Sequence, residues 1–71
     1  MNSLDDIKLR VFRLLDLISS TNHAIAFHQE RGQKGLSAVQ QYLELKRRYE
    51  DELIEILANE VGVQFPVALA A

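Results

Sequence analysis

The residues best suited to chemistry in this sequence are two histidines, His23 and His28. They are five positions apart, roughly 140° around a helix, so one helix cannot direct both at a single metal ion. Neither has a glutamate three or four positions away, the spacing that metal sites on one helix use. Ser19, Ser20 and Thr21 precede His23 in the same expected helix, where side chains diverge. We therefore expect no enzyme, no metal and no cofactor, and we interpret His28 as a partly buried core residue.

A short basic run at residues 46–48, followed by Tyr49, is the feature closest to a nucleic-acid signal. An acidic run at residues 50–52 follows at once and cancels its field. The formal net charge of −2 also argues against a surface built to neutralise phosphates. We interpret the basic run as a solvated helix face and expect no nucleic-acid partner.

The chain is too short to build a large core by itself. It has 71 residues and no cysteine, so disulfides and thiolate metal sites are excluded, and a core of this size contributes only about 3–5 kcal/mol. No apolar run approaches the roughly 20 residues of a membrane span. Asp5 and Asp6 stand where a secretory signal carries positive charge. We expect a cytoplasmic homo-oligomer of bacterial or viral origin, with a dimer favoured and no membrane partner.

Two long segments with helical periodicity flank a glycine-containing break. We expect one helix over about 3–31, a turn over 32–36 and a second helix over about 37–61. A short connection between long helices gives an antiparallel hairpin. One side of each apolar stripe then stays open to water, and a second hairpin would close it. The predicted fold is an all-α two-helix hairpin over 1–61 that dimerises into a coiled-coil-like four-helix bundle.

Local signals define the expected helix ends. The Ser3 hydroxyl can accept a hydrogen bond from the N–H of Asp6 at the start of the first helix, and Gly32 suits the left-handed conformation after its end. The segment Ser37–Gln40 has the pattern of a capping box for the second helix. Gly62 would terminate that helix.

The apolar positions of the first segment alternate in steps of three and four, as in a coiled coil or helix bundle. The second segment has one apolar half. The residues expected to form the oligomer seam are Leu4, Ile7, Val11, Leu14, Ile18, Ile25, Val39, Tyr42, Leu43, Tyr49, Leu53, Ile56 and Leu57. If the turn centres near residues 33 and 34, the basic residues Lys8, Arg10 and Arg13 fall beside the acidic end of the second helix with Glu55 and Glu60, which supports the antiparallel pairing.

Both segments turn polar at the same expected level. Thr21 and Asn22 interrupt the first stripe, and Lys46 and Glu50 interrupt the second. Two interpretations stay open. One is a shared polar layer that fixes register, as a buried Asn does in coiled coils. The other is a loosely packed, hydrated region in the middle of the paired helices.

Opposite the seam of the first helix, Leu9, Phe12 and Phe27 form a sparse second apolar stripe. Aromatic residues are enriched where protein surfaces bind. We expect this candidate partner face to be buried by an oligomer or by a heterologous protein.

The tail, residues 62–71, carries no charge, and Pro66 favours extended geometry at Phe65. We expect Phe65 to anchor the tail on the bundle, with a loose protease handle as the alternative. The final residues, Ala68-Leu69-Ala70-Ala71, resemble the end of the tag that transfer-messenger RNA adds to stalled bacterial proteins. That resemblance implies recognition of the free carboxylate by an unfoldase-protease.

The expected architecture also resembles the small helical-hairpin dimer that regulates plasmid copy number by binding paired RNA loops. This resemblance implies one alternative, an RNA-binding regulator built as a dimeric hairpin. The function that we expect is a small non-enzymatic protein–protein interaction module: an adaptor, a small inhibitor or an assembly subunit.

Overall fold

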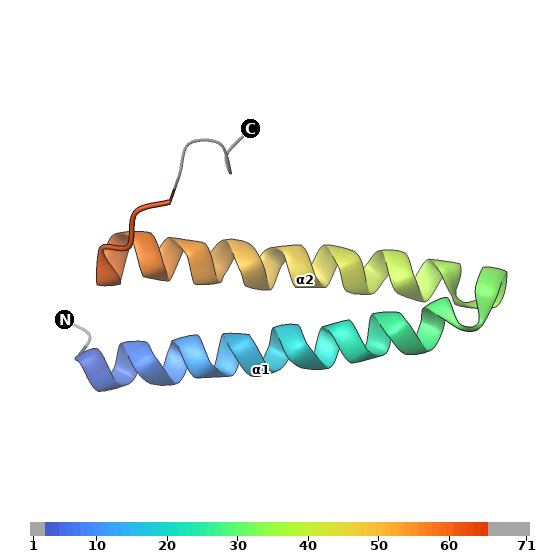
Figure 1. Ribbon diagram of the computed structural model, residues 1–71, viewed down its shortest axis with the longest axis horizontal. Coiled ribbons are helices and arrows are strands. Elements are labelled where there is room, and N and C mark those ends of the chain that lie inside the picture. Colours follow the sequence, from blue (N-terminus) through green and yellow to red (C-terminus); the bar gives the residue numbers. More distant parts are fainter. Residues whose placement is uncertain (1–2, 66–71) are drawn as a thin grey trace.

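The computed structural model describes residues 3–65, which form an antiparallel pair of helices (Figure 1). Helix α1 spans Leu4–Gln29 and helix α2 spans Leu36–Ile56. A short 3-10 turn, η1 (Gly32–Gly35), joins them, and a π-helical turn, η2 (Leu57–Val61), continues α2. The described residues contain no strand. The expected all-α helical hairpin is therefore confirmed.

The outer ends of the helices are capped as the sequence predicted. Ser3 Oγ accepts a hydrogen bond from the N–H of Asp6 at 3.2 Å. Gly62 adopts the left-handed conformation with φ 91°. The N–H groups of Gly62 and Val63 both donate to the carbonyl of Leu57, which satisfies an oxygen that a helix end otherwise leaves without a partner.

The capping box expected at Ser37–Gln40 is wrong. Helix α2 begins one residue earlier, at Leu36, and Gly35 at its N-cap provides no side-chain hydrogen bond. A side-chain cap needs non-helical backbone at the cap residue, but the chain enters α2 directly from η1, where the N–H of Leu36 donates to the carbonyl of Gln33. The Ser37 hydroxyl is already inside the helix and cannot act as the cap.

Two glycines shape the turn for different reasons. Gly32 has φ 63°, the left-handed conformation expected after α1, and a Cβ there would meet open space. Gly35 has an ordinary φ of −94°, but a Cβ there would overlap the backbone carbonyl oxygen of His28. The first glycine is needed for its conformation and the second for the close approach of the two chain segments.

The hairpin is a single layer of helices, so its core is thin. Its Cα atoms extend over 45 × 28 × 13 Å, and the two helices lie side by side, so the shortest dimension contains a single layer. The most enclosed hydrophobic residue, Ile56, still keeps 3% of its surface exposed, and no described side chain is fully enclosed. The buried hydrophobic residues are Ile7, Leu14, Ile25, Val39 and Ile56.

The turn geometry makes a testable prediction. We expect Gly35→Ala to reduce the free energy of unfolding by about 1–3 kcal/mol, because the added methyl forces the backbone of α1 and the turn apart. The control is Gly32→Asn, which tolerates the left-handed conformation and faces open space, and it should lose less than half as much. Urea unfolding at one fixed protein concentration measures both; equal losses would contradict the close approach at Gly35.

Candidate interaction surface

Exposed apolar residues on α2 lie in a single stripe. Leu36, Leu43 and Ile54 keep between 47% and 55% of their surface exposed. At 100° per residue they fall within about 20° of one line along the helix. This line is about a quarter turn from the side of α2 that packs on α1. Leu57, half-buried, lies at its edge.

Helix α1 carries a matching stripe. Leu4 and Leu15 are exposed, and Val11 and Ile18 are half-buried. Their positions fall within about 60° of one another around the helix. This stripe also lies about a quarter turn from the buried line of its own helix.

Both stripes lie on the same side of the hairpin. Viewed along its own chain direction, each helix carries its stripe about a quarter turn from its buried side chains, and the turn has the same sense in both helices. Because the two helices are right-handed and antiparallel, equal rotations lead to the same side of the layer. We call this side the apolar face and define it by Leu4, Val11, Leu15, Ile18, Leu36, Leu43, Ile54 and Leu57.

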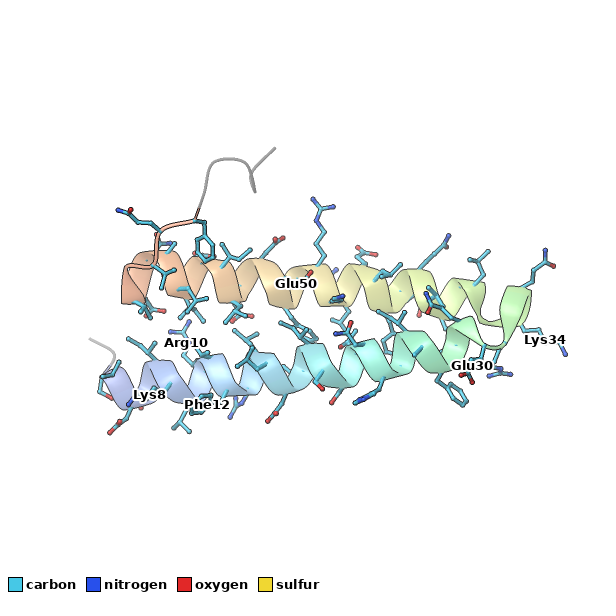
Figure 2. The ribbon with its side chains drawn as sticks, viewed as in Figure 1. Lys8, Arg10, Phe12, Glu30, Lys34 and Glu50 are labelled. Atoms are coloured by element: carbon cyan, nitrogen blue, oxygen red, sulfur yellow. The ribbon has the colours of Figure 1, made fainter. Side chains whose placement is uncertain are left out.

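The other side of the hairpin carries charged residues beside the half-buried Leu17 and Leu45, and an ion pair between described residues bridges its two helices. Arg10 donates to both carboxylate oxygens of Glu60, at 2.9 and 3.2 Å, and Figure 2 shows Arg10 directed from α1 toward α2. The side chains are 44% and 28% exposed, so solvent screening limits this pair to about 1 kcal/mol or less. An open groove beside it is lined by Glu52, Glu55 and Asn59. The expected placement of the basic end of the first helix beside the acidic end of the second is confirmed.

The predicted seam residues divide between the hairpin core and the apolar face. Ile7, Leu14 and Ile56 form a buried cluster, against which Val11, Tyr49 and Leu53 pack. Ile25 and Val39 are also buried, Ile18, Tyr42 and Leu57 are half-buried, and Leu4 and Leu43 are exposed. Burial of the exposed members by a second copy stays a prediction.

Three residues of the apolar face, Leu15, Leu36 and Ile54, were missing from the predicted seam. Leu36 was assigned to the turn, and Ile54 lies beside the charged residues 50–52. A signal was available, because Leu36, Leu43 and Leu57 lie on a seven-residue spacing.

A single hairpin does not assemble the four residues of the proposed polar layer. Thr21 is buried, and its hydroxyl donates to the carbonyl of Leu17 at 2.6 Å within α1. Lys46 is half-buried, whereas Asn22 and Glu50 are exposed. Neighbouring residues such as Thr21 and Asn22 point about 100° apart on a helix, so they cannot share one layer inside the hairpin. A layer formed between two copies stays a prediction.

An aromatic cluster lies beside the turn. The rings of His28 and Tyr42 stack with centroids 5.6 Å apart, and Phe27 meets His28 edge-on at 5.1 Å. His28 is half-buried, so its ring packs between α1 and α2 as an apolar surface. Within residues 3–65, no group of three or more His, Asp or Glu side chains is placed to hold a metal ion.

The candidate partner face is exposed but not contiguous. Leu9, Phe12 and Phe27 each keep more than half of their surface exposed, and Figure 2 shows Phe12 on the side of α1 turned away from α2. Phe12 and Phe27 are about 22 Å apart along the helix axis, and Phe27 contacts His28. Leu9 and Phe12 therefore form one small apolar spot and Phe27 another.

The basic run at residues 46–48 does not form one patch. Lys46 is half-buried toward α1, Arg47 is exposed at the apolar face, and Arg48 lies 3.8 Å from Glu44 in the same helix. Three consecutive helical residues point in directions about 100° apart. The structure thus spreads these charges around α2.

Only the first part of the tail falls within the described residues. Val63 and Phe65 keep 40% and 39% of their surface exposed. Pro66 and the final Ala68-Leu69-Ala70-Ala71 lie outside the described residues, so the tail anchor and the protease handle stay predictions.

Comparisons with protein-family models, with curated proteins and with solved structures find no match to this chain. None of the helices formed by the described residues is both long enough and apolar enough to cross a membrane. The interpretation of the surface therefore depends on the chain's own geometry.

The polar layer gives a prediction for Asn22. We expect Asn22→Leu to raise the melting temperature and to broaden the distribution of oligomeric states, because a leucine on the apolar face no longer penalises alternative registers. His23→Leu, one position on and away from this face, should change neither property. Calorimetry with sedimentation velocity measures both, and a destabilised but homogeneous Asn22→Leu dimer would count against the layer.

Proposed function

We propose that this chain is a small non-enzymatic protein–protein interaction module that works as a homodimeric four-helix bundle. The observation that carries the proposal is the apolar face, where exposed apolar residues of both helices lie on one side of the hairpin. Exposed apolar side chains gathered on one side of a protein are typical of a binding site. The charged opposite side, with its Arg10–Glu60 pair, is suited to face water.

The exposed area supports this proposal. The chain exposes 5806 Å², whereas a compact monomer of 8.1 kDa exposes about 4500 Å². The surplus of about 1300 Å² exceeds the roughly 800 Å² that each partner buries in a standard interface. A second copy that buries about 800 Å² of each chain would lower the exposed area per chain to about 5000 Å², closer to the compact value.

The thin core of the hairpin also supports a dimer. Helices gain most of their stability from tertiary packing of an apolar face, and in one hairpin each helix packs along only one line. A second layer would enclose the apolar face and convert half-buried Val11, Ile18 and Leu57 into core residues. We infer that folding and association are coupled.

The bundle would leave a surface for a further protein partner. Leu9 and Phe12 are exposed, and Figure 2 shows Phe12 on the side of α1 turned away from α2. Leu9 lies one turn before Phe12 on the same helix. Both are away from the apolar face, so dimerisation leaves them exposed in two copies. An exposed Phe beside a Leu can anchor in an apolar pocket of a partner. This arrangement suits an adaptor, a small inhibitor or an assembly subunit.

The first test is a charge on the apolar face. We expect Leu43→Glu to weaken the dimer at least 100-fold, because covering an unpaired carboxylate costs several kcal/mol. Leu9→Glu, an equal change on the outer edge of α1, should leave the dimer intact. Light scattering coupled to gel filtration gives the mass of each variant, and a Leu43→Glu chain that remains a full dimer would contradict the proposal.

The second test concerns the heterologous partner. We expect Phe12→Ser with Phe27→Ser to abolish capture of a protein partner from the native cell while the circular-dichroism helix signal stays, because both rings are exposed. The single variant Phe12→Ser shows which of the two apolar spots the partner contacts. Unchanged capture by the double variant would show that neither residue contacts a partner. Capture of RNA, with binding that weakens steeply as salt rises, would instead support an RNA-binding regulator.

A further inference from the structure

Six exposed residues of α2 and η2 are arranged in symmetric pairs about the middle of this segment. The segment from Leu36 to Val61 has its midpoint between residues 48 and 49. Three pairs lie at equal distances on either side of that midpoint: Leu36 with Val61, Leu43 with Ile54, and Arg47 with Glu50. All six residues are exposed, and each pair is either apolar with apolar or basic with acidic.

A two-fold interface needs this type of symmetry. In an isologous contact, residue i of one copy meets residue j of the other, and j meets i. If a two-fold axis crosses the apolar face at the midpoint of α2, perpendicular to the helices, Leu43 meets Ile54 of the second copy. Arg47 then meets Glu50 of the second copy, and the reverse pair forms on the other side of the axis.

From this order we propose that a second copy docks on the apolar face with the two turns at opposite ends, and that two reciprocal Arg47–Glu50 ion pairs fix this arrangement. The inference rests on the proposed homodimer and names the geometry of its contact. Neither residue forms an ion pair with another described residue of its own chain. Both lie within about 40° of the line through Leu36 and Ile54. A covering layer would therefore remove water from both charges, which costs free energy unless the two charges pair.

The same axis accounts for the polar position on α1. The Arg10–Glu60 ion pair and the His28–Tyr42 stack define which residues of the two helices lie at one level. By that relation the midpoint of α2 is level with Thr21 and Asn22. The exposed Asn22 side chains of the two copies then face each other at the axis, next to the Arg47–Glu50 pairs, and a polar layer forms between copies.

The opposite geometry leaves these charges without partners. With both turns at the same end, α2 of one copy would lie against α1 of the other. Arg47 and Glu50 would then be level with His23 and Ser20, and neither would meet an opposite charge. Charge complementarity therefore favours turns at opposite ends.

A charge swap tests the ion pairs. We expect Arg47→Glu alone and Glu50→Arg alone to raise the dimer Kd at least tenfold, because each brings like charges together twice. The double swap should return the Kd to within about threefold of the wild type. The control is the same double swap at Glu44 and Arg48, an ion pair of the same helix outside the apolar face, which should leave the Kd unchanged.

A distance measurement tests the arrangement itself. The sequence has no cysteine, so Lys34→Cys in the turn accepts a single spin label per chain. Turns at opposite ends place the two labels about 40 Å apart, whereas turns at the same end place them within about 20 Å. A dimer with the short distance, or a double swap that fails to restore the Kd, would overturn this inference and leave the homodimer standing. A folded monomer, in which no label-to-label distance can be measured, would overturn both this inference and the proposed homodimer.

Discussion

The thickness of the hairpin is the constraint on which the rest of the structure depends. Two antiparallel helices form a layer only 13 Å deep between Cα extremes, so each helix can bury one line of side chains and must expose the residues on either side. Even Ile56, the most enclosed hydrophobic residue, keeps contact with solvent. Such a layer gains little from packing within itself, and this is why we propose that a second copy covers the apolar face.

The turn and the ion pair determine which residues that face contains. Gly35 lets the backbone of the turn approach the carbonyl of His28, and Arg10 meets Glu60 at the open end. Together they fix the level of each α1 residue relative to α2. The exposed Arg10–Glu60 pair adds little stability, but it reports the register, and the alignment of Asn22 with the middle of α2 depends on that register.

The sequence predicted features whose cause is local or periodic. The Ser3 cap, the left-handed Gly62 and the contact between oppositely charged helix ends all follow from residue types at defined spacings. The capping box failed because the backbone enters α2 already helical, a property of the turn and not of Ser37. The common level of the four polar-layer residues did not show which side of the hairpin each one occupies, because Thr21 is buried within it and its neighbour Asn22 is exposed. Leu36 and Ile54 were missed because charged or turn residues surround them in the sequence.

The central claim is that this fold is completed by a second copy, and a dilution series tests it most directly. Helix content by circular dichroism and mass by sedimentation would be followed together from high micromolar to nanomolar concentration. The account predicts that the helix signal falls in step with the loss of the dimer, because the single layer does not hold the helices by itself. A chain that keeps its full helix signal as an 8.1 kDa monomer at the lowest concentration would contradict the account.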